Sequence, residues 1–312
     1  MASRTPRATY SAPALFLCAA IAACGGSADQ VEDDVIRAST VNGVGAPGLI
    51  LTFDDGPRVY VSPVVYKGAD GSQTSVGSSA DLAEWLQKRG VKATFFMVGA
   101  LASSKEGIEQ LKRIAAAGHT IGNHTFSHFT SPAFGRRALL TQEDEIEKAD
   151  TVLFAEDATF SRNLLRSAAG KQVVFLRTPG GSWDKLDAPA LNAKFGARYV
   201  GPIHWDIGGD APAADFSCWA TKKTVAECTQ LYRDDIVAHG EAGIVLLHDS
   251  ISASALVAMT LVDEHLKSGK KFYSLADAPR VRTMMNSTTG FSERFSLPDG
   301  RGGDATTELS AE

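Results

Sequence analysis

Two short strings place acidic and histidine side chains at spacings that could hold a metal ion. Asp54 and Asp55 stand side by side at the end of the apolar run 48–53, while His124 and His128 lie four residues apart. One carboxylate and two neutral imidazoles form a three-ligand set that binds a divalent ion and leaves a coordination position open. The second aspartate stays free for proton transfer. The combination is typical of a metal-dependent hydrolase.

Each string also has a plainer interpretation when it is taken alone. Asp, Gly and Pro are common turn residues, so the segment from Asp54 to Pro57 could simply close a strand. The two histidines could lie on a surface loop. Two histidines and a carboxylate also suit non-haem Fe(II), which makes an iron oxygenase a further alternative. Oxygen uptake coupled to a cosubstrate would favour that alternative.

The elements that must position these residues predict an α/β fold. From residue 48 onward, short apolar runs alternate with amphipathic segments, a pattern that favours parallel strands joined by crossover helices in a single domain. Strands are expected over 48–53, 92–98, 172–177, 198–205, 243–248 and 271–275. Helices are expected over 80–89, 105–117, 138–154, 187–195, 221–238 and 254–267. The Ser- and Gly-rich residues 58–79 predict a rim or lid loop.

Several polar residues stand at or just past the ends of predicted strands. They are Asp54, Arg177, Asp206 and His248. The carboxyl ends of parallel strands meet on one face, and active sites of barrel enzymes gather there. The sequence therefore predicts one site on that face.

Five strings together make the chain similar to the polysaccharide deacetylases with NodB homology, carbohydrate esterase family four. They occur in the family's order, at residues 52–57, 124–128, 177–181, 205–210 and 246–248. The resemblance implies a distorted (β/α) barrel of about seven parallel strands, within a catalytic domain over residues 48–280. A C-terminal extension would follow over 281–312.

The resemblance implies different roles for the two aspartates. Asp55, His124 and His128 would hold the metal, for which we expect Zn²⁺, with Co²⁺, Ni²⁺ and Mn²⁺ as alternatives. Asp54 would take a proton from water as the general base. Arg177 would pair with Asp54 and keep it ionised and oriented.

The remaining strings would complete the site. His248 would protonate the departing amine as the general acid. A backbone N–H from the turn over 179–181 would contribute to oxyanion stabilisation. In the string from Trp205 to Asp210, either Asp206 or Asp210 would orient Arg177 or His248.

Two strings depart from the family pattern. Gly180 stands where relatives often carry an aromatic residue, and Asp206 and Asp210 are four apart rather than three, without the usual Trp after them. We expect Gly180, Trp205 and Leu246 to meet the substrate, although Leu246 could equally be an ordinary core residue. These departures concern substrate fit more than the metal ligands.

The family resemblance favours removal of N-acetyl groups from a polysaccharide that contains N-acetylglucosamine, such as peptidoglycan. An esterase that removes O-acetyl groups from a xylan-like polymer is the alternative of nearest chemistry. A catalytically silent glycan-binding lipoprotein is the alternative of another class. Intact candidates for base, acid and metal ligands argue against the silent protein.

The N-terminus predicts export. Arg4 and Arg7 precede an apolar run over 13–23, which is typical of a signal peptide and too short to span a membrane. Residues 21–26 resemble a bacterial lipobox, in which Cys24 becomes the lipidated first residue. We therefore expect a signal peptide over 1–23, a tether over 24–47 and a membrane-anchored lipoprotein of the cell envelope. Ordinary secretion is the alternative.

The net charge of the chain bears on nucleic-acid binding, and its cysteine content bears on disulfide formation. A formal net charge of −5 argues against nucleic-acid binding, which needs a basic stripe. With Cys18 removed in the signal peptide and Cys24 lipidated, Cys218 and Cys228 remain. An exported compartment permits them to form a disulfide, and two free thiols are the alternative.

Overall fold

The structure, a computed structural model, describes residues 48–128, 142–154, 165–181, 187–209 and 212–287. The predicted signal peptide, the lipidation site Cys24 and the tether lie outside these residues, as does the chain beyond residue 287.

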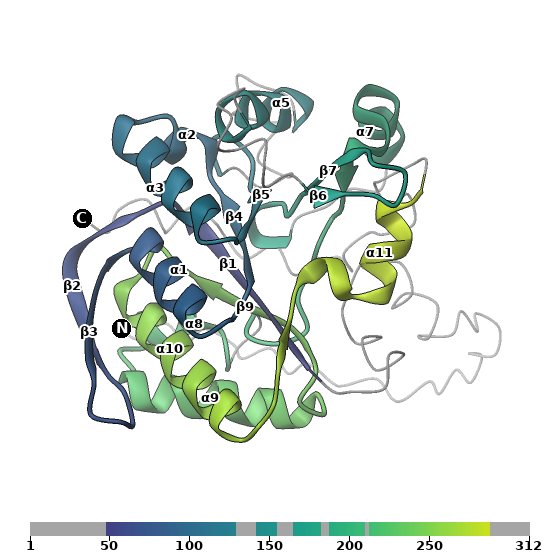
Figure 1. Cartoon of the computed structure of the whole chain (residues 1–312). Helices are drawn as coiled ribbons and strands as arrows, with labels where there is room; N and C mark the ends of the chain where they lie inside the picture. Colours follow the sequence, from purple (N-terminus) through teal and green to yellow (C-terminus); the bar gives the residue numbers. More distant parts are fainter. Residues whose placement is uncertain (1–47, 129–141, 155–164, 182–186, 210–211, 288–312) are drawn as a thin grey trace, which may run out of the picture.

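Parallel strands form the centre of the fold (Figure 1). The larger sheet has the order β10-β1-β4-β5, and β9 pairs with β1 as well. Its strands are β1 (Leu49–Gly56), β4 (Ala93–Met97), β5 (Thr120–Asn123), β9 (Gly243–His248) and β10 (Phe272–Tyr273). Because every pair in this sheet is parallel, the carboxyl ends of β1, β5 and β9 meet at one edge.

A three-stranded sheet continues the arrangement. It consists of β6 (Leu165–Arg166), antiparallel to β7 (Gln172–Phe175), and of β8 (Tyr199–Val200), parallel to β7. Parallel bridges join Asn123 to Leu176 and Ile207 to Val245. Seven of the described strands thus have a parallel partner (β1, β4, β5, β7, β8, β9 and β10). The α/β class is confirmed, and the curved arrangement is that of a distorted barrel which the described strands do not close.

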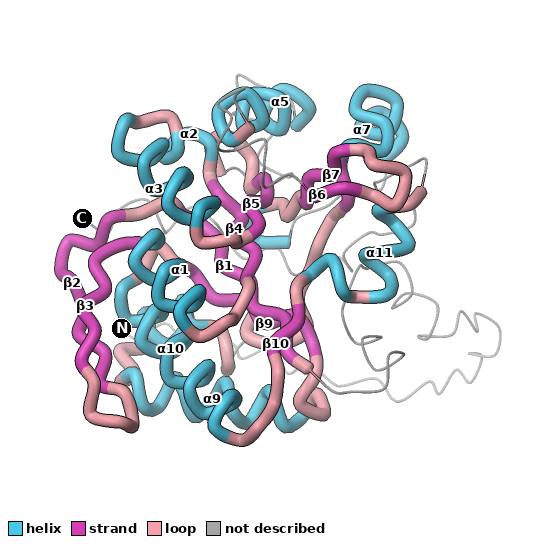
Figure 2. Tube along the Cα trace, viewed as in Figure 1, coloured by secondary structure: helices cyan, strands magenta, loops and turns pink. Residues whose placement is uncertain are grey.

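Helices cover the larger sheet, with α1, α3 and α10 across one side of it (Figure 2). The helices of the described residues are α1 (Ser79–Lys88), α2 (Gly99–Ala102), α3 (Lys105–Ala116), α5 (Gln142–Leu153), α7 (Asp187–Phe195), α8 (Asp215–Ala220), α9 (Val225–Ala238), α10 (Ser252–Lys267) and α11 (Pro279–Met285). Short 3₁₀ turns lie over Pro179–Gly181, Gly196–Arg198 and Leu275–Asp277. Within the described ranges, no helix combines the length and apolarity needed to cross a membrane.

The strands β1, β4 and β9 bury both of their faces, which explains why they appear in the sequence as nearly continuous apolar runs. On β1, Phe53 belongs to the core cluster that also holds residues of α1, α3 and α10. Ile50 belongs to a second cluster on the other face, with Phe96 and Phe175. Since side chains alternate along a strand, Asp54 follows Ile50 on this second face. The face that carries the site is therefore backed by its own core.

The segment expected to be a loop over 58–79 is mostly a β-hairpin, and that prediction was wrong. Strands β2 (Val59–Lys67) and β3 (Gln73–Ser78) pair antiparallel and form a separate two-stranded sheet. β2 is rich in Val and Tyr, residues that favour strands. Tyr66 is buried and donates a hydrogen bond to Asp263 Oδ2 at 2.7 Å, which ties the hairpin to α10.

The boundaries of some elements differ from the predicted ones, because capping residues and proline override the apolar pattern there. The helix expected over 221–238 begins at Val225, because Thr224 and Glu227 form a capping box there. The strand expected over 198–205 ends at Val200, before Pro202. The domain boundary predicted at residue 280 falls inside α11, whose Val281 is buried in the second core cluster.

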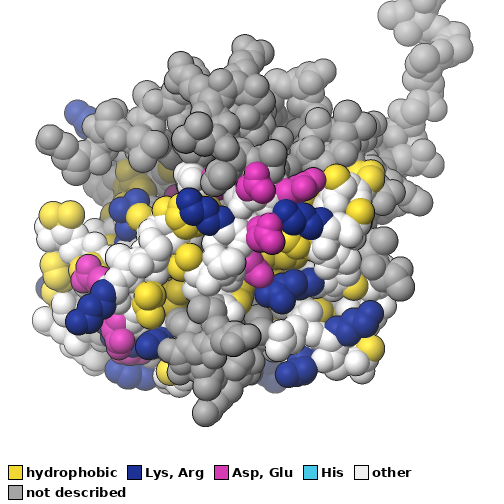
Figure 3. Space-filling model, turned by 90° about the horizontal axis from the view of Figure 1, so that it is seen from above, with side chains coloured by type: hydrophobic (Ala, Val, Ile, Leu, Met, Phe, Trp, Pro, Cys, Tyr) yellow, Lys and Arg dark blue, Asp and Glu magenta, His cyan; other side chains and the backbone are white. Residues whose placement is uncertain are grey.

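Surface charge is mixed on the face seen in Figure 3. There, over the described residues, basic and acidic side chains lie beside one another.

Candidate metal centre and catalytic site

An irregularity in β1 separates the two adjacent aspartates. The register of β1 against β4 shifts between Asp54 and Gly56, and Asp55 has a φ of 75°. In a regular strand these two side chains would point to opposite faces, but a bulge redirects the residue within it. As a result, Asp55 Oδ1 lies 2.9 Å from His128 Nε2 and 3.4 Å from His124 Nε2.

Asp55, His124 and His128 thus form a cluster in which the three ligand atoms lie within 4.8 Å of one another. His124 Nδ1 contacts the carbonyl of Arg177 at 2.7 Å, so that Nδ1 carries the proton and Nε2 keeps its lone pair toward the cluster. Asp55 Oδ1 is buried yet accepts no hydrogen bond of good geometry. A divalent ion would satisfy these donor atoms, so the residues present fit the predicted metal.

The electrostatics of the cluster favour positive charge. Burial raises the pKa of Asp55, but the contacts with His124 and His128 outweigh burial and hold that pKa well below its usual value. Burial lowers the pKa of His128, and Asp55 more than compensates, so the net shift is upward. The carboxylate thus stays ionised and favours the protonated form of His128. A metal cation bound to the cluster would supply that positive charge instead.

A residue of α5 forms hydrogen bonds with the loop that carries both histidines. Glu145 is buried, and its carboxylate accepts hydrogen bonds from Ser127 N at 2.6 Å and Ser127 Oγ at 2.8 Å. Thr125 and His128 both have positive φ values, 65° and 58°, a conformation that non-glycine residues rarely adopt. Such strain persists only where the surroundings fix it. Glu145 supplies part of that fixation, a role that no motif in the sequence indicated.

Arg177 meets Asp54 as predicted. The guanidinium is fully buried, and its Nη1 donates to Asp54 Oδ1 at 2.8 Å and to Thr52 Oγ1 at 2.9 Å. Its Nε donates to the carbonyl of Ile203. Burial lowers the pKa of Arg177, while Asp54 opposes that effect. The other oxygen, Asp54 Oδ2, lies 3.7 Å from His124 Nε2, beside the metal cluster.

His248 is held by a residue that the sequence analysis missed. Asp215, the first residue of α8, is fully buried, and its Oδ1 lies 2.6 Å from His248 Nδ1. The carboxylate thus engages Nδ1 and leaves Nε2 as the ring nitrogen that can meet a substrate. Asp215 is followed directly by the aromatic Phe216. An acid next to an aromatic residue was the available signal, because the fourth family string combines those residue types.

This carboxylate changes the acidity of His248. Burial lowers the pKa of the imidazole, but Asp215, with smaller contributions from Asp55 and Asp54, raises it to about 10. His248 therefore stays protonated at neutral pH.

Phe216 adds an exposed aromatic surface beside this histidine. Its ring packs edge-on against the imidazole of His248, with centroids 5.7 Å apart, and 41% of the residue is exposed. Large aromatic side chains are normally buried. An exposed ring next to a candidate proton donor is a candidate substrate contact.

Of the two aspartates of the predicted fourth string, Asp206 lies within the described residues. Asp206 Oδ2 accepts the N–H of Ile244 at 2.7 Å, near the start of β9. It also contributes to the electrostatic environment of Arg177. Asp210 lies outside the described residues. Asp215 thus makes the contact with His248, which is one of the two roles that we expected of Asp206 or Asp210.

The three residues expected to meet substrate lie in different surroundings. Gly180 is exposed in the turn after Arg177, with a φ of 60°. Trp205 is partly buried behind that turn, where a Cβ on Gly181 would come within 2.9 Å of its ring. Leu246 is buried and lies on the face of β9 that His248 shares, since the two are two residues apart.

A comparison with protein families identifies the chain. The model of the polysaccharide deacetylase family matches residues 42–200. The chain belongs to this family. The match includes the metal cluster, Asp54 and Arg177, while His248 and Asp215 lie beyond it.

Curated members of the polysaccharide deacetylase family are similar to the chain over part of their length. A chitooligosaccharide deacetylase of Sinorhizobium fredii is 30% identical over 175 residues, which are 56% of this chain and 64% of that protein. A chitooligosaccharide deacetylase of a Bradyrhizobium species is 28% identical over 66% of this chain and 72% of its own length. A peptidoglycan-N-acetylglucosamine deacetylase of Bacillus cereus is 32% identical over 42% of this chain and 35% of its own length.

Solved structures share the fold of this deacetylase-family chain. The crystal structure of the Bc1960 peptidoglycan N-acetylglucosamine deacetylase gives a TM-score of 0.51, with 20% identity over 78% of this chain and 90% of that one. A Streptococcus mutans esterase of carbohydrate esterase family four gives 0.50, with 23% identity over 79% and 94%. At these identities the likeness concerns the fold alone.

Proposed function

We propose that the protein is a metal-dependent hydrolase that removes N-acetyl groups from an N-acetylglucosamine-containing polysaccharide, such as peptidoglycan. One observation carries the proposal: the cluster of Asp55, His124 and His128 lies next to the Asp54–Arg177 pair, while His248 follows on the strand beside β1. Family membership supports it, since the curated relatives named above are deacetylases of chitooligosaccharide or peptidoglycan.

Asp55, His124 and His128 would hold the metal. A divalent ion bound there supplies Lewis acidity toward a carbonyl and makes nearby water more acidic. We expect Zn²⁺, because imidazole and carboxylate ligands with an open position suit it, and Co²⁺, Ni²⁺ or Mn²⁺ would suit the same donors. Metal analysis of the purified protein tests this expectation.

Asp54 would take the proton from the attacking water. Its Oδ1 is occupied by Arg177, while its Oδ2 lies on the side of His124 and is the oxygen available for the proton. The charge-assisted contact with Arg177 orients the carboxylate of Asp54.

His248 would return a proton to the departing nitrogen. An amine leaves poorly as an anion, so a protonated imidazole at this position favours cleavage of the amide. In the turn over Pro179–Gly181, Pro179 has no N–H and that of Gly181 donates to the carbonyl of Thr178. Gly180 therefore carries the N–H that could meet the substrate oxygen. Phe216 and Leu246 would border the acetyl group.

The test is acetate release across a panel of N-acetylglucosamine oligomers, peptidoglycan and O-acetylated xylan. We expect release from the N-acetylated glycans, loss of release with a chelator, and recovery on addition of metal. Release from acetylated xylan alone would support the O-acetyl esterase instead. Glycan binding without metal-dependent release from any member of the panel would support the silent binding protein.

We also propose that the protein is exported and anchored in the cell envelope through lipidated Cys24. The support is the sequence alone: two arginines, an apolar run over 13–23, and the lipobox-like residues 21–26. Metabolic labelling with a radioactive fatty acid tests it. The label should appear on the wild-type protein and be absent from Cys24→Ala, while labelling of both variants would contradict the assignment.

A further inference from the structure

Tyr232 connects three segments on the His248 side of the site. It lies on α9 and is fully buried. Its hydroxyl accepts a hydrogen bond from Asp215 N at 3.2 Å and donates to the carbonyl of Leu246 at 2.9 Å, with the carbonyl of Gly208 also at 3.2 Å. Burial raises the pKa of Tyr232 well above its usual value, so the hydroxyl keeps the proton that it donates.

Two of these contacts concern the acid–base pair directly. Asp215 is the residue whose carboxylate holds the ring of His248, and Leu246 stands two residues before His248 on β9. One hydroxyl group therefore contacts both the backbone of Asp215 and the strand that carries His248. The side-chain contact between Asp215 and His248 depends on that relative placement.

The chain makes room for this hydroxyl at Gly208. A Cβ on Gly208 would lie 2.4 Å from the Tyr232 ring and 2.5 Å from the carbonyl of Leu246, and its φ is 87°. Only glycine tolerates both the close approach and this backbone conformation. The local sequence thus agrees with a tight junction around Tyr232.

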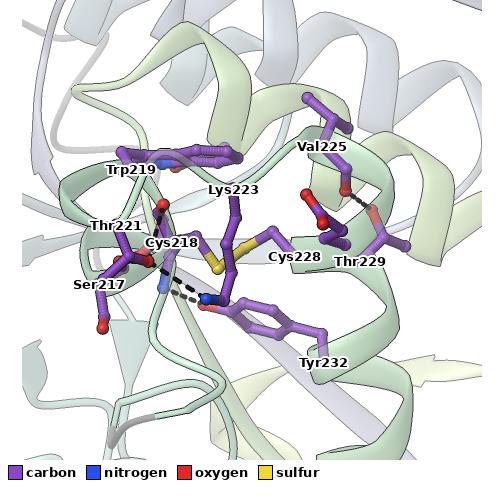
Figure 4. The surroundings of a disulfide bond; sticks show 12 residues. Ser217, Cys218, Trp219, Thr221, Lys223, Val225, Cys228, Thr229 and Tyr232 are labelled. Carbon is purple, nitrogen blue, oxygen red and sulfur yellow. Dashed lines mark hydrogen bonds between the residues drawn. A yellow bond between two sulfur atoms is a disulfide. The ribbon is translucent and has the colours of Figure 1, made fainter.

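A disulfide holds α8 against α9 at the same place (Figure 4). The predicted bond between Cys218 and Cys228 is present, and both residues are fully buried. Cys228 lies four residues before Tyr232, so both side chains project from one face of α9 toward α8. Because α8 has only six residues, it depends on tertiary contacts for its position.

We propose that Tyr232, supported by the Cys218–Cys228 disulfide, is a positioning residue that holds Asp215 against His248. The inference rests on the proposed function only in giving His248 a catalytic role, and the geometry it concerns can be measured without substrate. Tyr232 acts through Asp215 and touches no reacting atom.

The experiment compares Tyr232→Phe with Tyr66→Phe. Each variant removes the hydroxyl of one buried tyrosine, but Tyr66 bonds to Asp263 in the hairpin contact. The first readout is the downfield proton resonance of His248 Nδ1–H, assigned by its loss in His248→Gln. It should be present in the wild type and in Tyr66→Phe, and lost or broadened in Tyr232→Phe.

The second readout is steady-state kinetics of acetate release from the N-acetylated glycan that the wild type deacetylates. Tyr232→Phe should lower kcat about tenfold, a loss of about 1.4 kcal/mol, with KM changed less than about twofold. A Cys218→Ser, Cys228→Ser double variant should weaken the same resonance. An unchanged resonance in Tyr232→Phe, or equal loss in Tyr66→Phe, would overturn the proposal. An intact resonance without deacetylation by the wild type would leave the positioning role standing and contradict the proposed function instead.

Discussion

Asp215 accepts two hydrogen bonds from His248, one from the backbone N–H at 2.8 Å and one from ring Nδ1 at 2.6 Å. A single buried carboxylate thus fixes both the strand end and the orientation of the imidazole. The same contact sets the protonation of the ring, because a buried negative charge favours the imidazolium.

The first prediction concerns the pH dependence of turnover. With a pKa of about 10, the acidic form of His248 is present at neutral pH and is lost as the pH rises through that value. Activity should therefore fall on the alkaline side near that pKa. Asp215→Asn removes the charge that raises the pKa, so the fall should move toward neutral pH, as measured by acetate release across a pH series.

Asp206→Asn is the matched control for this measurement. Asp206 bonds to the N–H of Ile244 rather than to His248, so its replacement should leave the alkaline fall where it is in the wild type. If Asp206→Asn moved that fall and Asp215→Asn did not, the fourth-string role would belong to Asp206.

The second prediction concerns the buried pair of Arg177 and Asp54. Arg177→Met should lower the free energy of unfolding by about 3–5 kcal/mol, because it leaves the buried carboxylate of Asp54 without its partner. Part of that loss should return in the double variant with Asp54→Asn. Urea denaturation measures both values.

An exposed ion pair supplies the control for Arg177. Arg233 and Glu264 are 2.6 Å apart, and their side chains are 38% and 47% exposed. Arg233→Met should change the free energy of unfolding by about 1 kcal/mol or less. If Arg177→Met and Arg233→Met lowered the free energy of unfolding equally, the buried pair would contribute no more to stability than the exposed one.

The third prediction concerns Phe216. Phe216→Ala should lower kcat/KM by up to about tenfold, since aromatic contacts contribute about 0.5–1.5 kcal/mol beyond area burial. Phe216→Tyr keeps the ring and should retain most activity. Val237→Ala truncates another exposed apolar residue, on α9, and should have no effect. Wild-type kinetics in Phe216→Ala would remove Phe216 from the substrate site.

The fourth prediction concerns metal affinity. Glu145→Gln weakens the hold on Ser127, which lies in the histidine loop, and should raise the metal Kd by about tenfold. Glu147→Gln is the control, because Glu147 lies on the same helix but pairs with Lys194 at the surface. Competition with a chelating dye measures both, and equal affinities of the two variants would contradict the role of Glu145.

The sequence predicted the fold where local pattern decides it. The runs that became β1, β4, β9 and β10 are apolar on both faces and so stand out from their surroundings. The hairpin of β2 and β3 was missed because Ser and Gly in the segment suggested a loop, while the tertiary contact of Tyr66 with Asp263 that stabilises it has no local signal. The two-residue strand β8 depends on its neighbours in the same way.

The sequence also predicted part of the candidate site. Motif residues placed the metal cluster and the Asp54–Arg177 pair, which the structure brings together. Asp215 and Glu145 were not found, because neither belongs to one of the five strings that carried the resemblance, and their contacts with His248 and Ser127 form only in the folded chain. The bulge at Asp55 also escaped prediction. It depends on a positive φ that nothing in the sequence requires, yet it is what separates the two aspartates.

The separation of Asp54 and Asp55 into base and metal ligand is the central feature of the site. Asp54→Asn and Asp55→Asn should be compared for bound metal per chain and for acetate release under identical conditions. We predict that Asp54→Asn keeps its metal and loses turnover by about 10²-fold or more, while Asp55→Asn loses metal and turnover together. Loss of metal in Asp54→Asn with full occupancy in Asp55→Asn would contradict the assignment of base and ligand.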